Sequence, residues 1–171
     1  METNDARAMA ALTTGIYVLT VADGARRHGM SSSWVTQVSG VPLLLMASVD
    51  SNHFTAGIIA RTGAFGLNIV GARGRALEDY FYSARSRRPD NLEELDFELS
   101  PKLGVPWLKL AAITLEARVV QSVVAGDHTV HLAEPVGVRI GAGDRPLTSL
   151  DLDYVYVGGK QVIARDRTGW E

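Results

Sequence analysis

Short glycine-containing turns between β-rich segments constrain the fold of this chain more than any other feature. Asp23-Gly24 follows a β-rich run over residues 15–21, and Ala125-Gly126-Asp127 separates two longer runs. Gly158-Gly159 joins a last pair of β-rich segments around residues 154–163. Strands joined by connections this short must be antiparallel, because a parallel crossover needs a dozen or more residues. The chain is therefore expected to be built from β-hairpins.

The first half also contains helical signals between its strands. Asn4 can cap a short helix that runs to about Leu12, and Asp50-Ser51-Asn52 supplies cap residues for a second helix. That second helix is expected to carry Phe54, Ile58 and Ile59 on one face and to end at Gly63. Before it, the nearly continuous apolar run 43–49 predicts a strand buried on both faces, and residues 65–70 predict another strand.

The middle of the chain is less regular. Residues 75–84 predict a helix with Leu77, Tyr80 and Phe81 on one face, followed by the charged, proline-broken loop 85–90. A short helix around residues 92–95 and an irregular excursion over residues 101–106 are expected to lie on the surface of the sheet. From residue 113 onward, strands dominate again.

This order of elements indicates the fold class. Because strands and helices do not alternate regularly, a doubly wound parallel sheet is disfavoured. A mainly β fold is expected instead, with a small antiparallel barrel and short helices packed outside it. At 171 residues, without internal repeats or a linker, the chain 1–171 is expected to form a single domain.

Composition excludes several classes of function. A formal net charge of −2 provides no long-range field to attract nucleic acid or an acidic membrane surface, so neither is an expected partner. The absence of Cys removes disulfides, thiolate nucleophiles and protein-held iron–sulfur clusters, so any redox chemistry must come from a bound cofactor. No signal peptide is seen, and no run approaches the roughly 18 apolar residues of a membrane span. A cytoplasmic location is expected.

The segment Gly29–Ser39, with the sequence GMSSSWVTQVS, is the strongest functional signal. The stretch otherwise predicts a strand, in which the small side chains of Ser31, Ser32 and Ser33 bury little apolar area. They provide a row of hydrogen-bonding groups instead. Met30 and Trp34 beside them can form the walls around a flat ring. The alternative interpretation is an edge strand whose serines face water.

The predicted helix start that follows residue 49 is a second donor group. A helix N-terminus presents unpaired N–H groups and a positive dipole, to which Ser51, His53 and Thr55 add side-chain donors, so it can bind phosphate. The alternative is an ordinary cap with a surface histidine. Because one strand links this helix start to the serine segment, both are expected to border one groove, the first facing a ring and the second a phosphate.

Other motifs favour no chemistry of their own. Gly71-Ala72-Arg73-Gly74 follows a strand, but a surface turn is the preferred interpretation over a phosphate loop. A metal site is not expected, because His128 and His131 fall on opposite faces of one strand while His28 and His53 lie on separate elements. The Arg85–Arg88 run is interpreted as a solvated loop, with closure over a bound cofactor or attraction of a ligand phosphate as the alternative.

Five segments together resemble the flavin reductase-like, FMN-binding split-barrel family, and within it the flavoredoxin-like branch. They occur in the family's order over roughly residues 8 to 140, and chance is a poor explanation for all five. The segments are Gly29–Ser39, Pro42–Leu45, Ser51–Thr55, Phe65–Val70 and Gly126–Val130.

The resemblance implies which residues hold the cofactor. The stretch matching Met30, Ser31, Ser32, Ser33, Trp34, Val35 and Thr36 contacts the isoalloxazine ring and ribityl chain in this family. The stretch matching Ser48, Asp50, Ser51, Asn52, His53 and Thr55 holds the phosphate. Where many relatives have Arg or Lys beside the phosphate, this chain has His53. Because imidazole is only partly protonated at pH 7, weaker and pH-dependent phosphate binding is expected.

The resemblance also implies an activity. Under this hypothesis, NADH or NADPH passes a hydride to bound FMN, or to FAD, and the electrons continue to free flavin or to a partner such as a monooxygenase or redox protein. The match at His128 is the expected catalytic residue, orienting the nicotinamide or neutralising developing charge, and its alternative is a polar residue on a barrel face. Two competing functions remain open: a flavoredoxin-like electron carrier that does not use NAD(P)H, and a barrel that binds another planar ligand. A homodimer is expected.

Overall fold

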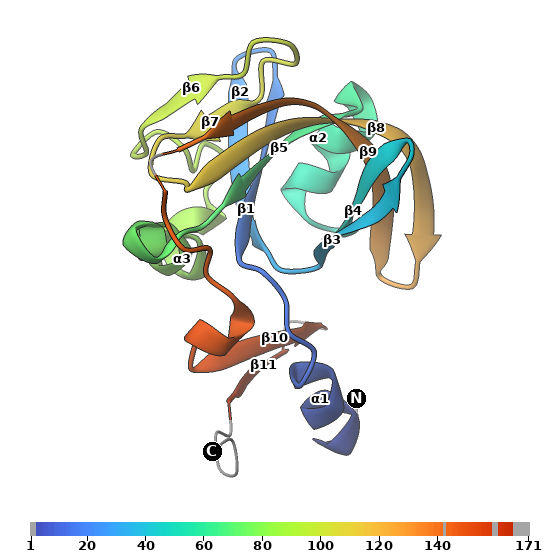
Figure 1. Cartoon of the computed structure of the whole chain (residues 1–171), viewed down its shortest axis with the longest axis vertical. Coiled ribbons are helices and arrows are strands. Elements are labelled where there is room, and N and C mark those ends of the chain that lie inside the picture. The colour runs from blue at the N-terminus through green and yellow to red at the C-terminus, as the bar shows by residue number, and fades with distance from the viewer. Residues whose placement is uncertain (1–2, 142, 159–160, 166–171) are drawn as a thin grey trace.

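A seven-stranded antiparallel sheet forms the body of the protein. The computed structural model describes residues 3–141, 143–158 and 161–165. The sheet order is β2-β1-β5-β8-β9-β4-β3, and the sheet curls into an open barrel (Figure 1). Its strands are β1 Tyr17–Asp23, β2 Arg26–Ser32, β3 Val35–Gly40, β4 Leu43–Asp50, β5 Ala64–Ile69, β8 Ile113–Ala125 and β9 His128–Ile140. The antiparallel barrel predicted from the turns is therefore confirmed.

The hairpin turns lie where the glycines predict them. β1 pairs with β2 from Tyr17↔Ser32 to Asp23↔Arg26, and Gly24 adopts a φ of 60° in the turn between them. The long β8–β9 hairpin turns at Gly126, whose φ is 65°. Left-handed backbone of this kind costs a residue with a Cβ energy that glycine avoids, so these two positions fix where the strands reverse.

The barrel is split between its two edge strands. β2 forms one edge of the sheet and β3 the other, and within the described residues no ladder joins them. Ser33-Trp34 connects the two edges along the chain. The serine segment therefore lies at the gap in the barrel, where backbone polar groups are not all committed to sheet pairing.

Helix α2 (Phe54–Thr62) packs inside the curve of the sheet (Figure 1). Ile58 and Ile59 are each 1% exposed and contact a buried cluster drawn from β1, β4, β5, β8 and β9. The helix ends at Gly63, which has a φ of 63° and donates its N–H to the Ile59 carbonyl, as the sequence predicts. Phe54 differs from the prediction: it is 41% exposed and packs on the His28 ring.

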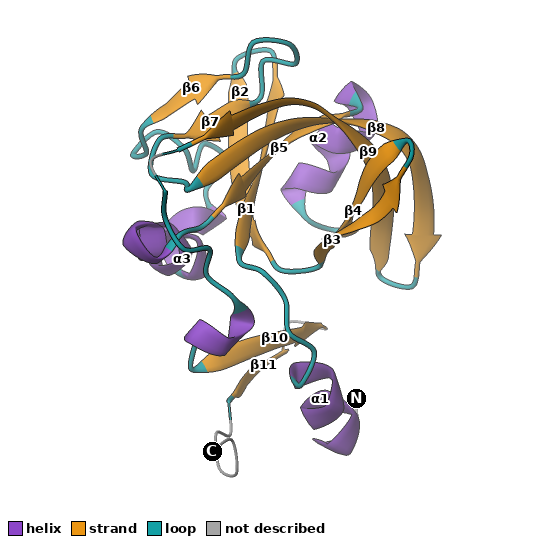
Figure 2. Ribbon diagram, in the orientation of Figure 1, coloured by secondary structure: helices purple, strands orange, loops and turns teal. Residues whose placement is uncertain are grey.

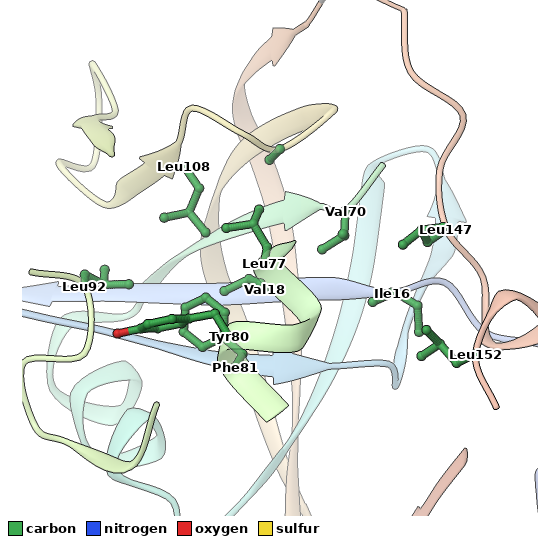
Figure 3. Packing of buried hydrophobic residues seen from close by; sticks show 11 residues of the cluster. Ile16, Val18, Val70, Leu77, Tyr80, Phe81, Leu92, Leu108, Leu147 and Leu152 are labelled. Carbon is green, nitrogen blue, oxygen red and sulfur yellow. The ribbon is translucent and has the colours of Figure 1, made fainter. Parts of the chain in front are cut away.

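Helix α3 (Arg75–Tyr82) covers the other face of β1 and β2, preceded by the single turn η1 (Ala72–Gly74) and followed by η2 (Ala84–Arg87). Its side chains Leu77, Tyr80 and Phe81 are buried, as predicted, among residues that include Val18 of β1, Val70 just after β5, and Leu147 and Leu152 near the C-terminus (Figure 3). Gly29 of β2 permits this approach, since a Cβ there would lie 2.9 Å from the Phe81 ring.

A smaller unit packs beneath the barrel (Figure 2). It joins helix α1 (Thr3–Ala10) to the hairpin of β10 (Tyr154–Gly158) and β11 (Gln161–Ala164), which follows the turn η3 (Ser149–Asp151). Ala6 packs on Val155 and Val157. The remaining strands, β6 (Phe97–Leu99) and β7 (Pro106–Leu108), pair only with each other.

Three further local predictions are wrong. Asn4 lies inside α1 (Thr3–Ala10) rather than capping it, and the helix ends at Ala10 rather than near Leu12. β4 is not buried on both faces: Leu45, Ala47 and Val49 are buried while the intervening side chains are partly exposed, because the strand has the barrel core on one side only. Residues 92–95 form turns rather than a helix, held by the 3.0 Å bond from the Leu95 amide to the Leu92 carbonyl.

None of the helices in the described part of the chain combines the length and the apolar character needed to cross a bilayer.

Candidate functional site

A cavity of about 290 Å³ lies between the split of the barrel and the C-terminal hairpin. The predicted site residues that line it come from three places in the sequence: the serine segment, the end of β4 with the start of α2, and the start of β9. They are Met30, Ser31, Ser32, Ser33, Trp34, Ser48, Asp50, His53 and His128. The serine segment therefore borders this cavity as predicted, and of the three side-chain donors predicted at the helix start only His53 does.

The serine segment forms the barrel side of this cavity. Ser31 and Ser32 end β2, and Trp34 precedes β3, so the row lies where the chain passes from one sheet edge to the other. The Trp34 carbonyl accepts a 3.0 Å hydrogen bond from the Ser48 amide, which fixes the segment to β4. The serines are buried or half-buried rather than open to water, which disfavours the solvated-edge interpretation.

Aromatic rings gather around Trp34. The Trp34 ring lies 4.8 Å from the His128 ring and 5.4 Å from the Tyr156 ring, with interplanar angles of 42° and 39°. Aromatic faces beside hydroxyl donors are the groups that a flat heterocycle with polar substituents requires. The cavity is thus suited chemically to a planar, hydrogen-bonding ring.

His128 is held in one orientation. It begins β9 after the Gly126 turn, is 5% exposed, and its Nδ1 lies 2.7 Å from Asp127 Oδ1. The Asp127 carbonyl in turn accepts a 3.0 Å bond from the Ser51 amide. The same hydrogen bond to His128 lowers the pKa of Asp127, so the carboxylate is ionised and keeps a proton on Nδ1. Nε2 is then the ring nitrogen available to a ligand.

The start of α2 differs in detail from the prediction. His53, not Ser51 or Asn52, is the N-cap, and its Nδ1 accepts a 3.2 Å bond from the Thr55 amide. Asp50 accepts the amides of Asn52 and His53, the first on its carboxylate at 2.8 Å and the second on its carbonyl at 2.9 Å. The helix start therefore has fewer unpaired donors than its sequence suggests, and it carries a carboxylate.

His53 is neutral at pH 7. Burial lowers its pKa, only partly offset by Asp50, and the accepting Nδ1 carries no proton. Its neighbour His28, 5.5 Å away, has its pKa lowered to about 4, first by burial and then by His53. The partial positive charge expected of His53 toward a phosphate is therefore absent near neutral pH.

Five predicted residues do not line this cavity. Val35 and Thr36 border a second, apolar cavity of about 310 Å³ on the other side of β3 and β4. Thr55 is fully buried with its Oγ1 3.0 Å from His28 Nδ1, so it supports the site from behind. Ser51 and Asn52 are exposed beside the helix start, and Ser51 Oγ lies 3.1 Å from Thr129 Oγ1.

Sequence reasoning missed the opposite wall of the cavity. It is formed by α3, η2 and the C-terminal hairpin with the segment before it, which lie far along the chain from the serines. The main missed residues are Glu78, Phe81, Tyr82, Ser86, Tyr154 and Tyr156. The only signal in the sequence is the period-2 pair Tyr154 and Tyr156, which places two aromatic side chains on one face of a strand.

The arginines of the 71–74 turn and of the 85–88 run are exposed, and of these two segments only Ser86 lines the cavity. Arg85 and Arg88 both pair with Glu94 beside Tyr80. Arg73 of the 71–74 turn lies 3.6 Å from Asp144, consistent with the surface-turn interpretation. Across the described residues, no three His, Asp or Glu side chains gather as a metal site.

The fold is that of a split barrel, in which the edge strands β2 and β3 are not paired and the connecting segment, rich in hydroxyl and aromatic side chains, lines a cavity at the split. The chain belongs to the flavin reductase-like family: the family model described as "Flavin reductase like domain" matches residues 9–160. The resemblance to the flavin reductase-like family drawn from the five segments is therefore confirmed.

Individual relatives agree with this assignment. The chain is 30% identical over 161 residues to an NADPH-flavin oxidoreductase of Streptomyces viridifaciens, covering 91% of this chain and 82% of the relative. Two solved structures share the fold. Nitrilotriacetate monooxygenase component B from Mycobacterium thermoresistibile has a TM-score of 0.79 at 22% identity, over 98% of this chain and 93% of that one. The Streptomyces globisporus NADH:FAD oxidoreductase SgcE6, in complex with NAD and FAD fragments, has a TM-score of 0.75 at 20% identity over 95% and 92%.

Proposed function

We propose that this protein is an NAD(P)H-dependent flavin reductase, which takes electrons from NADH or NADPH and delivers them through FMN or FAD to free flavin or to a partner monooxygenase. The observation that carries the proposal is the cavity in which Ser31–Ser33, Trp34 and His128 meet at the split of the barrel. Family membership and the relatives named as flavin oxidoreductases support it.

The residues present fit a flavin. The serine hydroxyls and neighbouring amides match the polar edge of an isoalloxazine, and the rings of Trp34, Tyr156 and His128 match its flat faces. Bound flavin supplies hydride acceptance and onward electron transfer, which no side chain of this cysteine-free chain provides.

Protein groups then have three tasks. The serine segment would bind and orient the ring, and its hydroxyl and amide groups would supply hydrogen bonds to the ring's polar edge. Trp34 and Tyr156 exclude water from one side of the cavity. His128, fixed by Asp127, presents Nε2 toward the nicotinamide or toward charge that develops during transfer.

A spectroscopic titration tests the activity. Protein mixed with FMN or FAD is expected to show a flavin spectrum perturbed by binding, which bleaches when NADH or NADPH is added under nitrogen. In air, steady oxidation of the nicotinamide with free flavin as acceptor is expected. Binding of flavin without nicotinamide turnover would point instead to the electron carrier, and no binding of either flavin would indicate a different planar ligand.

We also propose a homodimer. β3 is an edge strand of the sheet, and large apolar side chains are exposed near it: Val41 is 97%, Leu43 51% and Val38 47% exposed. A second copy covering this face would bury both the edge and the apolar side chains. Light scattering is expected to give twice the chain mass, and Leu43→Asp to shift the protein toward monomer, whereas Val162→Asp on the C-terminal hairpin is not. A wild-type protein of single-chain mass would contradict the proposal.

A further inference from the structure

A buried carboxylate connects the two walls of the cavity. Glu78 of α3 is 4% exposed and lines the cavity. Its Oε2 accepts a 2.9 Å hydrogen bond from the Ser31 hydroxyl, and its Oε1 accepts a 2.9 Å bond from the Tyr154 hydroxyl. A carboxylate only accepts hydrogen bonds, so both hydroxyls must direct their hydrogens to Glu78. The Ser31 hydroxyl oxygen can therefore accept a hydrogen bond from a ligand but has no hydrogen left to donate to it.

Tyr154 belongs to the C-terminal hairpin rather than to the barrel. Along β10, Val155 and Val157 pack on α1, so the alternation of a strand turns Tyr154 and Tyr156 to the cavity. The Tyr154 ring stacks on Tyr82 of α3, with centroids 4.5 Å apart and an interplanar angle of 22°. Burial and the nearby Glu78 raise the pKa of Tyr154, so its hydroxyl remains a donor across the physiological range.

The hairpin is not part of the barrel's hydrogen-bond ladder. β10 and β11 pair only with each other in the described structure, and the neighbouring η3 is tied to the chain before β1 by the bond between the Ser149 amide and the Thr14 carbonyl. The position of β10 against the cavity therefore depends on side-chain contacts, among them Glu78 with Tyr154, Tyr82 with Tyr154 and Trp34 with Tyr156. Side-chain contacts of this kind can open without disturbing the sheet.

We propose that Glu78 is a positioning residue that holds the β10 wall over the flavin cavity through Tyr154, and that this contact sets the rate at which flavin leaves. The inference rests on the proposed function. A reductase that hands reduced flavin to another protein must release it in each cycle, so an anchored wall of this kind decides whether flavin behaves as a retained cofactor or as a substrate.

The test measures flavin dissociation from the full chain. Tyr154→Phe removes only the hydroxyl, and Glu78→Leu removes the acceptor. Each is expected to increase the FMN dissociation rate, followed by stopped-flow displacement, about tenfold, the effect of losing one hydrogen bond to a charged group. Because both changes break one contact, the double variant is expected to release FMN no faster than the faster single variant.

Tyr80→Phe is the matched control. It also lies on α3 and loses a buried tyrosine hydroxyl bond, 2.6 Å to the Asn91 carbonyl, but it does not line the cavity. Its FMN dissociation rate is expected to stay within about twofold of wild type, so general loosening of the helix is separated from loss of the contact. If Glu78→Leu does not fold, Tyr154→Phe against Tyr80→Phe remains a complete comparison.

Two outcomes overturn the inference while leaving the proposed function intact: wild-type dissociation rates in both variants, or multiplicative effects in the double variant. Failure of the wild-type protein to bind FMN or FAD would overturn the function itself, and the inference with it.

Discussion

Replacing His128 with Ala is expected to slow the reduction of bound flavin by NADH or NADPH about a hundredfold, a typical loss when one orienting or proton-handling group is removed from a reactive geometry. His128 is 5% exposed and its Nδ1 is hydrogen-bonded to Asp127, so the ring is fixed and Nε2 is the nitrogen that remains to contact the nicotinamide. Alanine removes this nitrogen. The measurement is single-turnover stopped-flow reduction with protein saturated in FMN.

A second substitution separates chemistry from packing. His128→Phe keeps a ring against Trp34 but removes both nitrogens, so it is expected to be as slow as Ala while retaining flavin more tightly. His131→Ala is the control: it lies on the same strand, is equally buried and bonds Ser122 Oγ at 2.8 Å outside the cavity. An unchanged reduction rate in His128→Ala would remove His128 from the mechanism.

Replacing Glu116 with Ala is expected to lower the free energy of unfolding by about 3 kcal/mol, because several neutral donors lose their shared buried acceptor. Glu116 of β8 is fully buried. Its Oε2 accepts the Ser100 hydroxyl at 2.6 Å and the Leu103 amide at 2.7 Å, and the Lys102 amide lies 3.1 Å away. Deleting the carboxylate leaves these donors without their partner, so the connection between β6 and β7 loses its tie to the barrel.

Urea unfolding of the flavin-free protein measures this loss. Glu98→Ala is the control, because Glu98 makes a partly exposed ion pair with Arg139 at 2.9 Å and is expected to cost less than about 1 kcal/mol. Equal losses in the two variants would show that the buried network does not stabilise the barrel.

The fold could largely be predicted from short-range signals. Gly24 and Gly126 fix the two main hairpins because their backbone conformations are open to few other residues, and Gly63 ends α2 for the same reason. Burial could not be predicted as well. The apolar run 43–49 predicts a strand buried on both faces, but only alternate side chains of β4 are buried. Whether the second face of a strand is covered depends on elements that are distant in sequence.

The candidate site likewise contains residues that a local pattern in the sequence predicts and residues that it does not. Ser31–Ser33 and His128 carry local patterns and meet at one cavity, as predicted. His53 was not foreseen as the helix cap, because histidine is not among the preferred capping residues. Glu78 and Tyr154 are 76 positions apart, and the period-2 spacing of Tyr154 and Tyr156 does not indicate which residue Tyr154 contacts, so only the packed structure brings the two together.

The place where Ser33-Trp34 bridges the two ends of the sheet also bears on how such proteins diversify. Those residues both connect the two edge strands and line the cavity, so a substitution there that alters the cavity also risks disturbing the sheet. Helix α3 and the C-terminal hairpin line the same cavity from outside the ladder. Substitutions in this outer wall can therefore change the shape of the cavity without interrupting a strand of the barrel.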